Sequence, residues 1–465
     1  MKRHGLAVIA LAAAVGVPAA AADRPIIETS GTSVTLRPGG GPVPRQYFGL
    51  HISKLLQPHK SGRQSLWPDL DFGSWRLWGA YVAWRDLEPQ RGEFRFTRLD
   101  TYVRLAQTKN VELILTFGYT PTWASARPGE PCVFGTRGCA AEPADLDDWR
   151  DFVSTVAKRY KGQIRAYELW NEPQFDEDGE HRQPDQTYYS GSAASMVAMG
   201  RVAYRAIKDA DPAAIVLSPA VVSSARRLDT FLRLGGTGTF DVVAYHFYGA
   251  PPERMVDDTS ALKRVLARYG LDRLDIWNTE MGYYFERPRL GIAPTDRRQL
   301  FSDVIPERLA AAYVVRALTL GAALGLKRFE WYDWDSETPP SELPMGLASD
   351  DGSKPNAAGR AYARAIQWLR GWTIDNCTGQ KAGLWSCLLH QDGPVEYLVW
   401  SAGSNEGWRV PAPGGYAMPL EDGACFRKVA AGAGVDVGPM PWVVLMAEAP
   451  PPAAEPLCDE AGHPR

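Results

Sequence analysis

The stretch Ala166-Tyr167-Glu168-Leu169-Trp170-Asn171-Glu172-Pro173 has the pattern of a β-strand that runs out of its sheet into a loop. It ends with an amide and a carboxylate side by side, at Asn171 and Glu172. A second stretch of the same shape follows farther along the chain: Asp275-Ile276-Trp277-Asn278-Thr279-Glu280-Met281-Gly282. The two stretches predict that two acidic side chains, Glu172 and Glu280, lie at the ends of two strands.

Short apolar runs alternate with amphipathic helical stretches on both sides of these strands. The predicted strands are residues 47–51, 74–78, 111–117, 166–170, 214–218, 241–246, 275–280 and 328–332, and the helices between them include 97–108, 146–160, 193–209, 258–269 and 306–324. Eight strand-then-helix units match an α/β fold, a (β/α)₈ TIM barrel over residues 46–368. A doubly wound open sheet would need a Gly-rich phosphate loop after an early strand, and the sequence has none.

Polar and aromatic residues fall at or just past the ends of these predicted strands, on the face where barrels build active sites. They are His51, Arg76, Asn171, Glu172, His246, Tyr248, Glu280 and Trp331.

Strand-like runs alternate with Gly and Pro turns in the C-terminal part of the chain, and helical periodicity ends there. This pattern predicts an appended C-terminal antiparallel β-sandwich over residues 369–450. The segment 23–45 contains strand-like residues 33–36 and is expected to pair with this sandwich. Residues 451–465 form a tail rich in Pro and Ala.

The N-terminus has the three parts of a signal peptide: the basic head Met1-Lys2-Arg3-His4, an apolar run over residues 6–17, and small residues that end at Ala22. We therefore exclude residues 1–22 from the fold and expect a secreted or periplasmic protein. The alternative is a retained anchor, although the run is short for a bilayer and no later segment is apolar enough to be transmembrane.

An even number of cysteines, six, suits an oxidising compartment and up to three disulfides. Proximity along the chain favours Cys132 with Cys139, Cys377 with Cys387, and Cys425 with Cys458, among fifteen possible pairings. A metal site is the competing interpretation, but no CxxC pair or nearby His supports it.

Composition excludes several classes of function. The net charge of −3 over 465 residues includes no basic stripe, so nucleic acid is not an expected partner. The sequence contains neither a Gly-x-Ser-x-Gly pentapeptide nor an HExxH motif, which argues against a serine hydrolase and a zinc hydrolase. Sixteen Trp and nineteen Tyr slightly favour carbohydrate, because flat rings cover the apolar faces of sugars.

Two facing carboxyl groups are what glycosidic cleavage requires, one to protonate the leaving oxygen and one to attack or stabilise the anomeric centre. Trp170-Asn171-Glu172-Pro173 after the fourth strand, with Glu280 on the seventh, resembles the clan A glycoside hydrolases. Further motifs resemble family 39 and its exopolysaccharide-cleaving relatives: Trp84-Arg85-Asp86-Leu87-Glu88-Pro89, Gly92-Glu93-Phe94, Thr120-Pro121-Thr122-Trp123-Ala124 and His246-Phe247-Tyr248.

The resemblance implies a role for each matching residue. Glu172 would be the general acid/base and Glu280 the nucleophile, without a cofactor or a metal. Asn171 would bind the sugar 2-hydroxyl, Arg76 would keep Glu280 ionised, and the remaining substrate-binding candidates are His51, Trp123, His246, Tyr248, Trp331 (as a hydrophobic floor) and Trp334. Each candidate has a structural alternative, such as an ion pair of Arg76 with Glu168 or ordinary core packing of Trp331.

Three functions remain open from the sequence. The first is an endo-acting hydrolase of a bacterial exopolysaccharide, with loops 63–71, 127–145 and 175–186 as groove walls. The second is an exo-acting β-xylosidase-like enzyme, and the third is a non-catalytic polysaccharide-binding protein. A polysaccharide or oligosaccharide is the expected partner in all three, and nothing indicates an oligomeric state.

Overall fold

The computed structural model describes residues 24–56, 64–132, 136–174, 187–285, 304–335, 345–349, 352–446, 456–459 and 464. The expected signal peptide, the loop 175–186 and most of the tail lie outside the described residues. No helix among the described residues is both long enough and apolar enough to cross a membrane.

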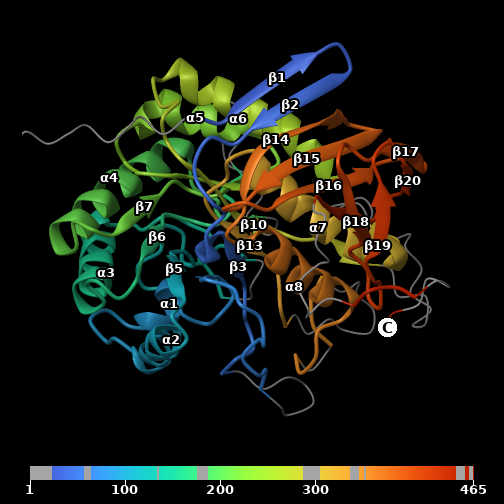
Figure 1. The fold of residues 1–465 in the computed structure, drawn as a ribbon. Helices are drawn as coiled ribbons and strands as arrows, with labels where there is room; N and C mark the ends of the chain where they lie inside the picture. The colour runs from blue at the N-terminus through green and yellow to red at the C-terminus, as the bar shows by residue number, and fades with distance from the viewer. Residues whose placement is uncertain are drawn as a thin grey trace, which may run out of the picture.

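A parallel sheet forms the larger part of the molecule (Figure 1). Its strand order is β7-β6-β5-β4-β3-β13-β10-β9-β8, and a parallel bridge between Leu217 and Val242 joins β7 to the start of β9, which closes the barrel. All eight predicted barrel strands are present, and β8 adds a short continuation after β7. The bounds are β3 (Phe48–Leu50), β4 (Ser74–Leu77), β5 (Glu112–Thr116), β6 (Ala166–Glu168), β7 (Ile215–Leu217), β8 (Val221–Val222), β9 (Val243–His246), β10 (Ile276–Met281) and β13 (Phe329–Trp331).

Amphipathic helices surround the barrel. The five predicted helices are confirmed within a few residues, and α3 shows why its bounds are sharp: the Asp145 side chain accepts from the backbone N–H of Asp147 at its start. The helical segments are α1 (Trp84–Leu87), α2 (Thr97–Thr108), α3 (Leu146–Arg159), α4 (Ala193–Ala210), α5 (Ala225–Phe231), α6 (Met255–Arg268), α7 (Glu307–Ala323) and α8 (Ala357–Leu369), with short turns η1 (Arg45–Tyr47), η3 (Leu232–Gly236) and η4 (Pro252–Arg254).

An antiparallel sheet forms the second part, as the sequence predicts for the C-terminal region. Its order is β1-β2-β14-β15-β16-β21-β18-β19, with a separate pair β17-β20, and residues 33–36 of β2 pair with β14. The bounds are β1 (Ile26–Ser30), β2 (Ser33–Arg37), β14 (Thr373–Gln380), β15 (Leu384–His390), β16 (Val395–Ser401), β17 (Glu406–Arg409), β18 (Gly414–Pro419), β19 (Arg427–Ala430), β20 (Gly434–Val437) and β21 (Trp442–Leu445); a small pair, β11 (Tyr284–Phe285) and β12 (Val304–Ile305), lies outside both sheets.

The three disulfides favoured by proximity are the ones present: Cys132–Cys139, Cys377–Cys387 and Cys425–Cys458. The second joins the neighbouring strands β14 and β15, and the third attaches the end of the chain beside Phe426. The last two therefore stabilise the antiparallel sheet, whereas the first closes a loop of the barrel.

A hydrogen bond from the sandwich to a buried ion pair of the barrel connects the two parts. Arg316 of α7 donates to both carboxylate oxygens of Glu253, and the indole N–H of Trp400, on β16, donates to the same carboxylate at 2.8 Å. Because all three side chains are buried, this contact fixes the sandwich against the barrel.

Glu396 lies on β16 on the same face as Trp400, is fully buried, and makes no side-chain hydrogen bond to any described residue. Burial raises its pKa well above the usual value. A group with a raised folded-state pKa supports folding below its unfolded pKa, and that support is lost as the pH rises towards the folded value.

We expect the Glu396→Gln variant to unfold at a higher temperature than the wild type at pH 8. The gain should vanish near pH 4 and grow by up to about 1.4 kcal/mol for each pH unit between the two pKa values. Thermal unfolding at several pH values measures it, with the exposed Glu421→Gln as the matched control. Equal effects of both variants would show that burial of the Glu396 carboxylate does not destabilise the folded protein.

Candidate active site

The barrel interior changes from apolar to charged towards the C-terminal ends of the strands. Ile114, Ala166, Ala244 and Trp277 form an apolar layer. Above it lie charged side chains from several strands, and all of the polar candidates predicted from the sequence except Tyr248 belong to fully or nearly fully buried residues. This is the face where barrel enzymes carry their chemistry.

Glu172 follows β6 with an unusual backbone. Its φ of 42° lies in the left-handed region, which is uncommon for a residue with a side chain. The backbone N–H of Glu172 donates to the carbonyl of Ala220 at 2.9 Å, and Asn171 forms a parallel bridge to Ala220. These contacts hold the strained residue in place, and strain of this kind persists chiefly at functional sites.

A β-bulge aims the second carboxylate. Along β10, Trp277 pairs with Ala244 and Asn278 with Tyr245, but Glu280 rather than Thr279 pairs with His246. One extra residue in β10 thus brings Glu280 into register with His246, whose imidazole contacts Glu172 inside the barrel mouth. Regular alternation would have turned Glu280 away from that side.

The two carboxylates meet at the barrel mouth. Single ligand atoms of Glu172, His246 and Glu280 all lie within 4.8 Å of one another. His246 Nδ1 is 2.8 Å from Glu172 Oε1, and the Tyr248 hydroxyl donates to Glu280 Oε1 at 2.8 Å. This spacing resembles that of retaining glycosidases, whose carboxyl groups are about 5 to 5.5 Å apart.

Arg76, from β4, joins the site to the barrel interior. Its guanidinium donates to Glu280 Oε2, to Glu168 Oε2 and to Asn171 Oδ1, each at 2.8 Å. Thr116 donates to Glu168 at 2.7 Å. Both sequence-based interpretations of Arg76 are therefore present together: it pairs with Glu168 inside the barrel and also contacts Glu280.

The cluster of Glu172, His246 and Glu280 also has the composition of a cation site. The guanidinium of Arg76 supplies positive charge directly to Glu280, so the carboxylates already have a cationic partner.

The two acids differ in their electrostatic surroundings. Burial raises the pKa of Glu172 to about 7, against the smaller opposing effects of Arg76 and Arg227. Burial also raises the pKa of Glu280, but Arg76 and the Tyr248 hydroxyl favour its ionised form. Burial lowers the pKa of His246 to about 4, so its imidazole is neutral at pH 7. Glu172 is thus suited to hold a proton near neutrality.

His51 directly follows β3, at the strand end where the sequence places it. The His51 ring is 5.1 Å from the ring of Tyr332, edge to face, and its Nε2 contacts the carbonyl of Thr279 at 3.1 Å. Burial raises the pKa of the half-buried Tyr332 phenol, and the charges of Asp333 and Glu280 raise it further.

The prediction that Trp331 forms the floor of the sugar site is wrong. Glu330 points into the barrel, where its carboxylate accepts from Ser74, so Trp331 points outwards by strand alternation. Its indole packs against Tyr283 and against Tyr362 of α8.

Trp123 lies in the loop that follows β5. Its indole N–H donates to the carbonyl of Glu88 at 3.0 Å, and its ring contacts Trp84 and the guanidinium of Arg91. The contact of Trp123 with sugar therefore stays a prediction. Trp334 is 2 % exposed and its backbone N–H donates to the carbonyl of His51, so it lies beside the site, and its contact with sugar stays a prediction.

The sequence-based prediction missed three aromatic residues, Trp78, Tyr119 and Tyr188, which form a cluster of packed rings. Trp78 directly follows β4, and Tyr119 comes shortly after β5. Their positions past strand ends were a signal that could have been used. Tyr188 precedes α4 and carries no such signal.

Comparisons with known proteins agree with this geometry. The family model described as glycosyl hydrolase family 10 matches residues 79–218, which include Glu172. An endo-1,4-β-xylanase of Agaricus bisporus is 31% identical over 134 residues, 29% of this chain and 36% of that protein. The endo-1,4-β-xylanase 2 of Claviceps purpurea is 33% identical over 127 residues, 27% of this chain and 35% of that protein. The chain is a relative of the clan A glycoside hydrolases.

Solved structures of clan A enzymes share the whole architecture. A family 39 glycoside hydrolase from Bacteroides cellulosilyticus WH2 covers 89% of this chain and 87% of its own, with a TM-score of 0.61 and 18% identity. A monomeric β-xylosidase from Caulobacter crescentus CB15 covers 89% of this chain and 98% of its own, with a TM-score of 0.59 and 17% identity. At this identity the likeness concerns the fold. The sequence match, by contrast, is to family 10 and spans only about a third of the length of the curated relatives.

Proposed function

We propose that this clan A relative is a retaining glycoside hydrolase that cleaves β-linked xylo-saccharides. The observation that carries the proposal is the pair Glu172 and Glu280, with carboxylate oxygens within 4.8 Å of each other at the mouth of the barrel. The names of the xylanase and β-xylosidase relatives support the sugar class.

In the first step, Glu280 attacks the anomeric carbon while Glu172 gives its proton to the departing oxygen. Arg76 and Tyr248 hold Glu280 from both of its oxygens. In the Nδ1–H tautomer, His246 donates to Glu172 Oε1 and leaves Oε2 for the transferable proton. The glycosidic C–O bond breaks and an ester forms between the sugar and Glu280.

In the second step, Glu172 takes a proton from a water molecule, which attacks the anomeric carbon and releases Glu280. The sugar then has its original configuration. Because Asn171 Oδ1 accepts from Arg76, its amide N–H groups are left to bind the sugar 2-hydroxyl, a contact that strengthens in the transition state. The two carboxyl groups and water supply this chemistry without a cofactor.

The stereochemical course tests the proposal. We expect the first product from a 4-nitrophenyl β-xyloside or from xylan, followed by proton NMR during the first minutes, to be the β-anomer. Release of the α-anomer would contradict the two-step mechanism. If only glucosides, mannosides or bacterial exopolysaccharides were cleaved, with retention, the sugar class would be wrong and the mechanism right.

The mode of cutting is the second part of the same assay. An endo-acting enzyme releases mixed oligosaccharides from xylan, whereas an exo-acting β-xylosidase releases xylose alone. The family 10 match over residues 79–218 and the xylanase relatives favour endo action, which we propose. A chain that binds xylan and releases no sugar would fit the non-catalytic alternative.

We also propose export from the cytoplasm, to the periplasm or the medium. The N-terminal signal-peptide pattern and three disulfides support it, because disulfides persist in oxidising compartments.

A further inference from the structure

Trp78, Tyr119 and Tyr188 form a wall of aromatic rings, which we call the aromatic wall. The rings of Trp78 and Tyr119 stack at 4.6 Å, and Tyr188 meets Trp78 edge to face at 5.7 Å. Trp78 and Tyr119 are each 6 % exposed, whereas Tyr188 is half-buried. Tyr188 is therefore the member of the aromatic wall whose ring surface a ligand can reach most easily.

Tyr188 is tied to the catalytic strand. The indole N–H of Trp170, two residues before Glu172, donates to the Tyr188 carbonyl at 3.0 Å. The pKa of the Tyr188 phenol lies above its usual value, first because of burial and then because of the charges of Glu172 and Glu280. Trp78, against which this ring packs, directly follows β4, the strand whose Arg76 contacts Glu280, so the ring lies at the same end of the barrel as the two carboxylates.

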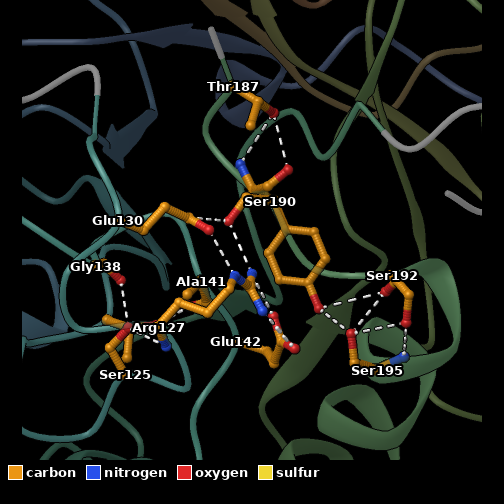
Figure 2. Close-up of polar contacts among 12 residues, drawn as sticks. Ser125, Arg127, Glu130, Gly138, Ala141, Glu142, Thr187, Ser190, Ser192 and Ser195 are labelled. Atoms are coloured by element: carbon orange, nitrogen blue, oxygen red, sulfur yellow. Dashed lines mark hydrogen bonds and ion pairs between the residues drawn. The ribbon is translucent and has the colours of Figure 1, made fainter. Parts of the chain in front are cut away.

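A polar network centred on Arg127 holds the segment that carries Tyr188 (Figure 2). The guanidinium donates to both oxygens of Glu142, at 2.9 and 2.8 Å, to Glu130 at 2.5 Å and to the Ser190 hydroxyl at 2.9 Å. Ser190 donates in turn to Glu130 through its hydroxyl and to the carbonyl of Ala140 through its backbone N–H. Two loops that are distant in sequence, 125–142 and 187–192, are joined in this way.

The same two loops are fixed at their other ends. The Tyr189 hydroxyl is 2.7 Å from the hydroxyl of Ser195, in the first turn of α4. The disulfide of Cys132 and Cys139 closes the first loop, and Cys139 is buried against the aromatic wall. The position of the Tyr188 ring therefore depends on contacts made by residues that do not themselves touch Glu172 or Glu280.

We infer that Tyr188 is a substrate-contacting residue that determines how a β-linked sugar fits between Glu172 and Glu280, and that Arg127 is the positioning residue that holds it there. The inference rests on the proposed glycoside hydrolase function and deepens it. A flat ring stacks on the apolar face of a pyranose, and a misplacement of about 1 Å near reacting atoms is enough to cost activity.

A double-mutant cycle tests the inference. We expect Tyr188→Ala and Arg127→Met each to raise KM for 4-nitrophenyl β-xyloside by about tenfold, with a smaller change in kcat. Because Arg127 acts through Tyr188, the double variant should also show about a tenfold increase and not a hundredfold one. Tyr188→Phe, which keeps the ring, should retain a KM close to that of the wild type.

The controls separate positioning from stability. Arg150→Met removes another ion-paired arginine, on the exposed surface of α3, and should leave KM unchanged. If Arg127→Met does not fold, Ser190→Ala can be used instead. It removes one hydrogen bond of the network and should also raise KM. Additive effects of Tyr188 and Arg127, or an unchanged KM in Tyr188→Ala, would overturn the inference.

A separate readout keeps the two proposals distinguishable. If the wild type cleaves no glycoside, the proposed function fails. In that case the role of the aromatic wall can still be measured by binding. Calorimetry would compare the affinity of xylotetraose for Glu280→Gln with its affinity for the double variant that also carries Tyr188→Ala. We expect about tenfold weaker binding without the Tyr188 ring, and equal binding would overturn its assigned role.

Discussion

Replacing Glu280 by Gln should lower kcat by on the order of 10⁴-fold or more, because the amide cannot form the glycosyl ester of the first step. The amide has the size of the carboxylate, and Arg76 keeps its contacts with Glu168 and Asn171 in the variant. We therefore expect a folded protein with a melting temperature near that of the wild type. Initial rates on 4-nitrophenyl β-xyloside and thermal unfolding measure the two quantities.

Azide makes the role of Glu280 more specific. In Glu280→Ala the nucleophile is replaced by a space, and azide can attack the anomeric carbon from that side in a single displacement. We expect azide to restore turnover of an activated β-xyloside and to give the α-glycosyl azide, with inverted configuration. A β-glycosyl azide would assign Glu280 to the other role, since attack would then come from the leaving-group side.

Glu330→Gln is the matched control for Glu280→Gln. Glu330 is also a fully buried glutamate on a barrel strand, but burial raises its pKa to about 8, so it is largely protonated at pH 7. An amide therefore replaces a group that is already neutral. We expect little change in kcat, and a loss as large as that of Glu280→Gln would mean that any buried carboxyl of the barrel is needed for turnover.

The barrel could be predicted from the sequence because each strand is a short apolar run with a helical period after it. The buried strands 48–50 and 112–116 carry this pattern, and neither needs information from distant residues. The carboxylates could be predicted for the same reason, since Glu172 and Glu280 each follow such a run directly. The eighth strand-then-helix unit, which the predicted barrel end at residue 368 includes, is completed by α8 (Ala357–Leu369).

The side that a residue faces was harder to predict. Trp331 and Tyr332 are neighbours, and only the contact of Glu330 with Ser74 decides which of the two points to the mouth. For Glu280, strand alternation gives the wrong side, because the bulge in β10 reverses the alternation that the sequence alone suggests. A single extra residue in a strand has no local signature, so the orientation of Glu280 towards Glu172 was expected from its motif and not from strand alternation.

Contacts between distant segments could be predicted only in part. The family resemblance implied that Arg76 lies near Glu280, and its ion pair with Glu168 was the structural alternative. The contact of Arg127 with Ser190, which joins two loops, was not foreseen. Each partner is an ordinary polar residue in its own stretch of sequence. The two acids and the side chains that contact them were therefore named from the sequence, while the loop contacts that hold Tyr188 emerge only from the fold.

The Glu172→Gln variant should lose activity in a way that depends on the leaving group. A general acid contributes about 10² to 10⁴-fold, so hydrolysis of unactivated xylo-oligosaccharides should fall by that factor. A 2,4-dinitrophenolate leaves without a proton, so the first step with this group should proceed almost normally. Stopped-flow measurement should then show a burst of dinitrophenol followed by slow turnover, as the second step lacks its base.

The pH dependence gives the same residue a second test. With a pKa of about 7, Glu172 is protonated below pH 7 and loses its proton above it. The kcat/KM of the wild type on xylo-oligosaccharides should therefore fall as the pH rises through about 7, since this ratio reports the free enzyme. In Glu172→Gln that alkaline decline should be absent, because the amide does not titrate. A decline that persists at the same pH in the variant would assign the titrating acid to another group, and Glu172 would then be no more than a carboxylate held at the end of β6.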